Sequence, residues 1–306
     1  MVLKKKLSKM SNESKGFILG FIGILIFSVT SAVTKLALGT SNDQLSPQFI
    51  TFGRAALAGS LSLIYLIIFK KKIPKLKYFI NFSIIALSIS VGFPLFLALG
   101  LVNSTSIHSG VILAFLPLVT AIIASFYFKH KASFGFWICA VVGCLLIVIY
   151  TILHAQSIKE VTTVSYSDLL FFIAVVSASV GYNVGAKLTK IMSSIDVISW
   201  VLASAMPFHL MLAIYYFPKN EIDLSAWLGF LYASLFSQWI GFFAWYKGLE
   251  MGGAVRVSQI QLLMPFLTFA FSIILLGETL DFLSIVFSFA IVSLIYFSRK
   301  MTVVRE

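Results

Sequence analysis

The side chains in this sequence that could do chemistry are few, and most of them stand alone within long apolar stretches. Arg54 lies roughly 12 Å, at the rise of a helix, from the nearer end of its stretch. Lys35 lies near the end of another stretch, and His209 lies inside a third. An ionisable side chain in an apolar helix faces the protein interior or a water-filled cavity, so it marks a candidate functional site. Arg54 could pair with backbone carbonyls in a structural role that tethers helices, or with an anionic group of a ligand. Arg54 and Lys35 would both suit a ligand with a carboxylate or another anionic group.

Polar side chains recur at helical spacing within three of the apolar stretches. Residues three or four positions apart lie on one face of a helix, so each set predicts a polar face. The sets are Ser28, Ser31 and Lys35; Ser179, Asn183 and Lys187; and Gln261, Pro265, Thr268 and Ser272. Gln238 and Trp239 add polar groups to a fourth stretch. Together these faces predict a hydrated central cavity.

Several of these residues also have a simpler interpretation as packing residues. Small hydroxyl side chains such as Ser31 let helices approach closely, and Lys35 can reach the membrane surface along its own stem. His209 can be a hydrogen-bonded packing residue or a protonatable gate. Buried amides are harder to explain in this way because they need partners. The candidate substrate-binding residues are Arg54, Lys35, Ser31, Asn183, Gln238, Trp239, Gln261 and His209.

The sequence offers no pattern typical of a metal site or a catalytic centre. Its four histidines are dispersed, and Cys139 and Cys144 lack metal-ligand spacing, so we expect no metal and no cofactor. No Asp or Glu falls in the middle third of an apolar stretch. Proton or sodium coupling through a carboxylate at the membrane centre is therefore not expected, while coupling through Glu250 or Glu278 stays open.

Ten apolar stretches of membrane-spanning length account for almost all of the 306 residues. Hydrophobic residues make up 59% of the chain, and mean hydropathy is +1.00. A helix needs about 20 apolar residues to cross a bilayer, which predicts an all-α integral membrane protein with ten transmembrane helices. The predicted spans are 16–38, 46–69, 78–101, 105–128, 132–154, 167–190, 194–217, 224–248, 254–276 and 280–298.

The basic residues are sorted between alternate loops. Nearly all of the 23 Lys and Arg residues fall on one side, which the positive-inside rule identifies as cytoplasmic. Both termini, the tails 1–15 and 299–306, are thus expected in the cytoplasm. The net charge of +12 is explained by this sorting and does not indicate nucleic-acid binding. The basic tail 1–15 and the apolar run that follows it also resemble a signal peptide. An uncleaved first transmembrane helix explains this apolar run better.

The two halves of the chain, 16–154 and 167–298, resemble each other. A shift of 148 residues superposes Pro117 on Pro265 and Thr120 on Thr268. Both prolines are predicted to bend the middle of a helix. Since each half has five helices, the halves must cross the membrane in opposite directions. Inverted repeats of this kind occur in many secondary transporters.

These features resemble the EamA family of the drug/metabolite transporter superfamily. The resemblance covers nearly the whole chain and includes the Leu-Gly-Glu-Thr-Leu sequence at 276–280 and the Phe-Gly-Arg-Ala-Ala-Leu sequence at 52–57. The first half departs from the family at 128–131, where Phe-Lys-His-Lys replaces the Gly-Glu pair. The role that the resemblance implies for Glu278 therefore does not extend to the first half. The resemblance to this family implies export of amino acids or metabolites, although related carriers also import.

The sequence thus favours a secondary transporter that moves a small organic solute by alternating access, with an amino acid or related metabolite as the solute. An importer or exchanger of a nucleobase, a vitamin or another metabolite is the alternative. An intramembrane enzyme, a sensor or a pore is less consistent with these patterns. High Lys, Ile and Phe usage suggests an AT-rich, bacterial genome. The inner membrane of a bacterium is therefore the expected location. The expected partners are the solute and the lipid bilayer, no nucleic acid is expected, and a homodimer stays open.

Overall fold

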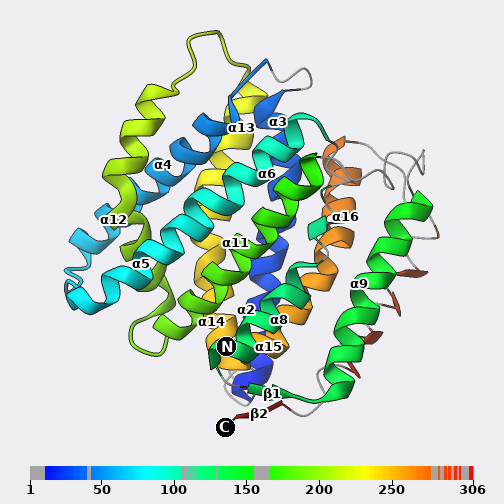
Figure 1. The fold of residues 1–306 in the computed structure, drawn as a ribbon. Coiled ribbons are helices and arrows are strands. Elements are labelled where there is room, and N and C mark those ends of the chain that lie inside the picture. Colours follow the sequence, from blue (N-terminus) through cyan, green and yellow to red (C-terminus); the bar gives the residue numbers. More distant parts are fainter. Residues whose placement is uncertain are drawn as a thin grey trace, which may run out of the picture.

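The computed structural model shows a bundle of closely packed helices (Figure 1). It describes residues 11–39, 43–104, 109, 112–113, 115–128, 130–154 and 166–276, and short pieces between 282 and 305. The predicted span 280–298 lies mostly outside the described residues, as does Glu278. Within the described part, the chain is helical apart from one short antiparallel ladder, in which β1 (His130–Ala132) pairs with β2 (Val303–Arg305). This ladder lies at the same end of the bundle as the beginning of the first helix (Figure 1).

Six of the described helices are long and apolar enough to cross a membrane. They are Asn12–Leu38, Pro47–Ile68, Leu76–Val102, Tyr166–Leu188, Ser194–Tyr215 and Leu224–Gly252. They coincide with the first, second, third, sixth, seventh and eighth predicted spans. Large apolar side chains such as Ile68, Leu87 and Ile214 are exposed on their outer faces, as a lipid environment requires. The described part of the chain is therefore that of a membrane-spanning protein.

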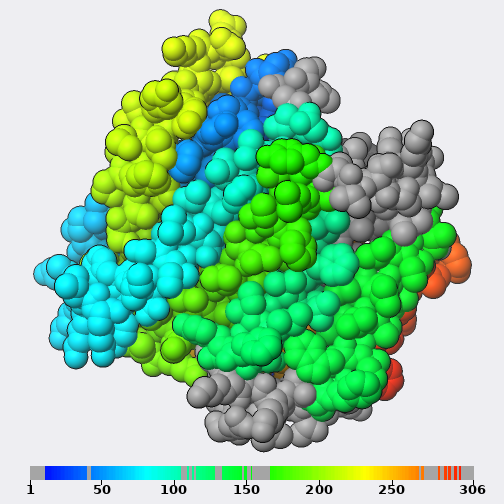
Figure 2. Space-filling view, viewed as in Figure 1, coloured from blue at the N-terminus to red at the C-terminus, as the bar shows by residue number. Residues whose placement is uncertain are grey.

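Three further predicted spans contain helices outside this set of six. The fourth span contains α8 (Leu116–Phe128), and the fifth contains α9 (Phe134–His154). The ninth consists of α15 (Ala254–Val257), the 3-10 segment η4 (Ser258–Leu263) and α16 (Met264–Leu276). On the face seen in Figure 2, side chains of α5, α6, α9, α11 and α12 fill the surface between the helices.

Several long helices change geometry near their middle. The first span divides into α2 (Asn12–Phe27) and α3 (Thr30–Leu38). The third span contains the π segment η2 (Ala86–Gly92), between α5 (Phe79–Ile85) and α6 (Phe93–Val102). The eighth contains the π segment η3 (Ala233–Ile240), between α13 (Leu224–Tyr232) and α14 (Gly241–Gly252). Segments of π geometry inside α-helices often occur at functional sites.

Glycines let α2 and α14 approach each other at backbone distance. A Cβ atom added to Gly248 would lie 2.7 Å from the nitrogen of Gly20 and 2.9 Å from the carbonyl oxygen of Gly16. Gly16 and Gly20 are four residues apart, and so are Gly248 and Gly252, which is the small-residue spacing of closely packed membrane helices. Since the facing atoms belong to the backbone, no side-chain rotation could relieve such a clash.

The pair formed by α4 (Pro47–Ile68) and α12 (Ser194–Tyr215) is held differently at its two ends. At one end, Phe49 contacts Phe217, Trp227 and Phe230, with ring centroids 5.3 to 5.9 Å apart. This set of four rings is called the aromatic end below.

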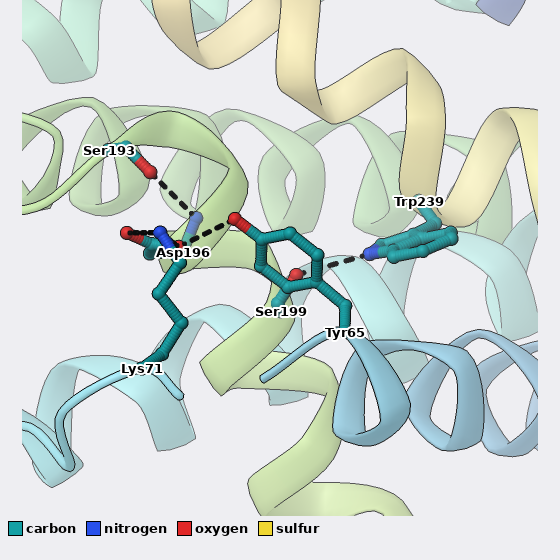
Figure 3. A network of polar contacts seen from close by, with 6 residues as sticks. All are labelled: Tyr65, Lys71, Ser193, Asp196, Ser199 and Trp239. Carbon is teal, nitrogen blue, oxygen red and sulfur yellow. Dashed lines mark hydrogen bonds and ion pairs between the residues drawn. The ribbon is translucent and has the colours of Figure 1, made fainter. Parts of the chain in front are cut away.

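The other end of the α4–α12 pair is polar (Figure 3). The Lys71 ammonium lies 2.9 Å from Oδ1 of Asp196, and the Tyr65 hydroxyl donates to the same oxygen at 3.0 Å. Asp196 occupies the first turn of α12, where the helix dipole favours a negative charge, and its backbone N–H donates to the Ser193 side chain that caps the helix. The hydrogen bond to Asp196 raises the pKa of Lys71 above its ordinary 10.5. Tyr65, Lys71 and Asp196 are called the polar end.

Replacing Gly248 with Val should destabilise the protein, because the new side chain would meet the backbone of α2. Overpacking of this kind costs about 3 kcal/mol or more where the backbone cannot move. We expect the midpoint of thermal unfolding in detergent to fall by about 5 °C or more. Ser83→Val is the matched control, since Ser83 is exposed on α5. Equal midpoints for the two variants would show that close approach of α2 and α14 is not needed.

Replacing Lys71 with Gln should weaken the polar end, and Lys72→Gln, which removes the same charge one residue further on, should not. Because the pair is partly exposed, we expect a loss of about 0.5–1 kcal/mol that shrinks at high salt. The raised pKa of Lys71 means that this stabilisation is complete below pH 10.5 and is lost only as pH rises through the raised value. Thermal unfolding at neutral pH and two salt concentrations would test this, and identical behaviour of the two variants would contradict it.

Candidate functional site

The changes of helix geometry meet at one cavity inside the bundle. Thr30 is the first residue of α3, Ile89 lies in η2, Ser237 lies in η3, and Met264 follows η4 directly. All four line one narrow cavity. The full lining consists of Phe27, Thr30, Arg54, Ile89, Phe93, Ala178, Tyr182, Ser237, Gln238, Phe242 and Met264.

Arg54 brings a full positive charge into this lining. It lies on α4, is 3% exposed, and makes no hydrogen bond or ion pair with any of the residues that the structure describes. A guanidinium carries five N–H donors and remains protonated in proteins. The Arg54 side chain therefore offers a cation and free donors to whatever enters the cavity.

Hydroxyl and amide groups connect the irregular segments around Arg54. The Gln238 amide donates to the Ile89 carbonyl and to the Ser90 hydroxyl, both at 3.3 Å, so that it links η3 to η2. The hydroxyl oxygens of Thr30 and Ser237 are 2.8 Å apart and link α3 to η3. Oε1 of Gln238 has no partner among the described residues.

Aromatic rings form much of the remaining wall. The Phe27 and Phe242 rings are 5.1 Å apart, and the Tyr182 ring lies 6.1 Å from Phe242 and 5.3 Å from Trp245. Tyr182 lines the cavity together with Arg54 and interacts with it electrostatically. The cavity thus combines one cation, a few neutral polar groups and an apolar, aromatic wall.

Of the eight predicted substrate-binding residues, the structure places Arg54 and Gln238 in the cavity lining. Asn183 is buried and donates to the carbonyls of Thr120 and Ser179, so it joins α11 (Tyr166–Leu188) to α8. The Trp239 indole donates to Ser199 at 3.2 Å and joins η3 to α12 (Figure 3).

The other predicted residues lie away from the lining. Lys35 donates to the Leu101 carbonyl at 2.9 Å, near the end of α6. His209 is buried between Phe52 and Phe208, with ring centroids 6.3 and 6.0 Å away. Ser31 is buried beside the lining residue Thr30.

Gln261 lies on η4, where it is buried and neither amide atom has a described partner. Pro117 and Pro265 are each the second residue of a described helix, α8 and α16. A proline in the first turn of a helix removes no helical hydrogen bond. The sequence predicted that both prolines bend continuous helices. In the ninth span, the change from 3-10 to α geometry lies directly before Pro265, at the junction of η4 and α16.

Sequence patterns missed three polar residues of the lining, each of them next to a predicted residue. The structure has Thr30 where the helical face predicted Ser31, and it adds Ser237 beside Gln238. One residue corresponds to about 100° of rotation in a regular helix. The break before α3 and the π geometry of η3 therefore turn the neighbouring side chain toward the cavity. Tyr182 also lines the cavity, whereas the sequence pattern chose its neighbour Asn183.

Comparisons with known proteins agree with this fold. The model of the EamA-like transporter family matches residues 14–152 and 165–299. The uncharacterized transporter YdeK of Bacillus subtilis (strain 168) is 33% identical over 293 residues, covering 95% of this chain and 99% of YdeK. The uncharacterized transporter YyaM of the same organism is 23% identical over 272 residues, covering 82% of this chain and 84% of YyaM.

A solved crystal structure has the same fold at 14% sequence identity. Its TM-score is 0.74, and the match covers 94% of this chain and 96% of that one. The family match extends over most of the chain in two consecutive regions, and the match to YdeK covers nearly all of it. The chain therefore belongs to the EamA-like transporter family.

Proposed function

We propose that this protein moves a small organic solute across the membrane by alternating access and that Arg54 binds an anionic group of the solute. The observation that carries the proposal is the buried Arg54 guanidinium, which lines the cavity and makes no hydrogen bond or ion pair with any described residue. Family membership supplies transport as the general function.

The energetics of buried charges favour an anionic group on the solute. An unpaired charge in a low-dielectric interior carries a desolvation cost of several kcal/mol. A carboxylate can accept two parallel hydrogen bonds from a guanidinium and offset that cost. An amino acid or a related carboxylic metabolite fits this requirement, and it would leave the neutral groups of Gln238, Thr30 and Ser237 to orient the rest of the molecule.

We further propose that 16–154 and 167–298 form two inverted repeats of five helices. Equivalent packing supports this arrangement: α2 contacts α14, and α6 contacts α11, while η2 and η3 interrupt the equivalent third helices. Hydroxyl contacts repeat as well. The Thr268 hydroxyl donates to the Ser28 carbonyl at 2.6 Å, and the Thr120 hydroxyl lies 3.1 Å from that of Ser179. Inverted repeats commonly hold the solute near the membrane centre, between the two halves.

The α4–α12 pair is the proposed element that opens and closes. It joins the two repeats and passes beside the cavity, through Arg54 on α4. We propose that the polar end opens toward the cytoplasm and the aromatic end toward the outside, with both termini in the cytoplasm of a bacterial cell. The basic residues that follow α4 support this orientation under the positive-inside rule.

Replacing Arg54 with Ala should abolish solute binding without unfolding the protein. A screen of carboxylic metabolites, amino acids and nucleobases by thermal shift would first identify a ligand, and uptake into proteoliposomes would follow. We expect R54A to lower uptake at least about tenfold, since a charged hydrogen bond is worth about 1.5–3 kcal/mol. The unliganded variant should be as stable as the original protein, because the removed charge had no partner.

Lys35→Gln is the matched control for this experiment, since it removes a cation that does not line the cavity. We expect K35Q to retain both the ligand-induced thermal shift and the uptake. Uptake by R54A at the original rate would contradict the proposed role of Arg54. A complete absence of uptake of every screened solute by the original protein would contradict the proposed transport of carboxylic metabolites.

Cysteine labelling should find position 75 accessible from the cytoplasm and position 221 accessible from the outside. Lys75 and Glu221 are both exposed in the structure, and they lie at loops of opposite predicted sides. The native Cys139 and Cys144 are buried and would be replaced with Ala to give a clean background. A membrane-impermeant maleimide added to intact cells should react at position 221 and not at position 75. The opposite result would overturn the proposed orientation.

A further inference from the structure

The cavity lining holds a single ionised side chain. Among the described residues that line it, Arg54 carries a charge, and the rest are neutral polar, aromatic or aliphatic. No described carboxylate forms an ion pair with Arg54. Within the part of the chain that the structure describes, the lining therefore carries one positive charge without a counter-charge, inside the membrane-spanning bundle.

The net charge of the solute decides what remains after binding. A monoanion brings the occupied cavity to neutrality, whereas a zwitterion satisfies the guanidinium but adds an ammonium and leaves one positive charge in place. Because a low-dielectric interior screens charge poorly, this remaining charge weighs heavily in the occluded state. Of these two ligands, the monoanion is the one that leaves no net charge in the occupied cavity.

An ammonium would also find only neutral acceptors among the described lining residues. The Thr30 and Ser237 hydroxyls share one hydrogen bond, and their remaining lone pairs can accept but bring no negative charge to balance the ammonium. Oε1 of Gln238 is the one amide oxygen left without a partner among the described lining residues. Aromatic faces attract cations, but such a contact returns less than the desolvation of an ammonium costs.

The wall opposite these polar groups suits an apolar body. Phe27, Phe242 and Tyr182 present aromatic rings, and Ile89 and Met264 add aliphatic surface. We infer that this cavity prefers organic monoanions with an apolar body, such as aryl or alkyl carboxylates, over zwitterionic amino acids of the same shape. The inference rests on the proposed function, because it refines the solute class of the same site.

Three ligands of nearly equal shape test the inference on the full-length protein. They are 3-phenylpropanoate, L-phenylalanine and 2-phenylethylamine, which at neutral pH carry net charges of −1, 0 and +1. Calorimetry in detergent would give each dissociation constant, and uptake into proteoliposomes would measure transport. We expect 3-phenylpropanoate to bind at least about tenfold more tightly than phenylalanine, which corresponds to about 1.4 kcal/mol. We expect no measurable binding of the amine.

Two variants show whether the charge balance of the cavity causes the preference. Arg54→Gln should lose the preference for the monoanion, whereas K35Q should keep it. Ser237→Asp would place a carboxylate in the lining, so it should favour phenylalanine over 3-phenylpropanoate and reverse the order. A preference that survives in R54Q would show that the charge of Arg54 does not cause it and would overturn the inference, even if S237D fails to fold.

The outcomes separate this inference from the proposed function. Phenylalanine binding as tightly as 3-phenylpropanoate would overturn the inference and leave a carrier of amino acids. Binding of 3-phenylpropanoate without saturable uptake would support the ligand class and contradict the transport of that ligand. Absence of binding for all three compounds would overturn the inference, while uptake of another solute in the wider screen would still support the proposed function.

Discussion

Backbone groups that leave regular helical geometry inside a membrane must find their partners within the protein, and this constraint organises the whole bundle. The break between α2 and α3, the π segments η2 and η3, and the 3-10 segment η4 all lie in membrane-length helices or predicted spans. Each of them contributes to the lining of the cavity or borders it. Irregular backbone, polar side chains and empty volume therefore gather at one place in the protein.

The close packing of α2 against α14 fixes the distances around that place. Gly16, Gly20 and Gly248 bring the two backbones together, and residues after Gly20 on α2 and before Gly248 on α14 form part of the cavity wall. Phe27 stands at the end of α2, and Phe242 stands near the beginning of α14, where their rings meet. The glycine contact and the aromatic wall are thus two consequences of one helix pair. Any substitution that separates these helices would widen the cavity as well as destabilise the bundle.

The sequence predicted the broad architecture well because hydropathy and charge sorting are properties of single segments. The predicted first, second, third, sixth, seventh and eighth spans each coincide with a described helix of membrane length. The site was harder to predict, since helical periodicity assumes an unbroken helix. Arg54 and Gln238 were identified as an ionisable group and an amide within apolar stretches. Periodicity chose Ser31 instead of Thr30, because no sequence signal marked the break at Ser28 and Val29. Asn183 was recognised as a buried amide that needs partners, yet no rule of spacing could show that those partners are the carbonyls of Thr120 and Ser179.

The two ends of the α4–α12 pair differ in a way that bears on how such a bundle could close. Rings at the aromatic end gain from burial, without the directional demands of hydrogen bonds, so they tolerate sliding. The polar end depends on the geometry of two groups, Tyr65 and Lys71, around the Asp196 carboxylate, so it separates at a definite cost and re-forms in one register. Arg54 lies on the same helix between the two ends. Neutralising its charge would lower the energy of any state in which both ends are closed around the cavity, because that state excludes the water that otherwise solvates the guanidinium. The interaction that selects the solute would then also favour the occluded state through which the solute must pass.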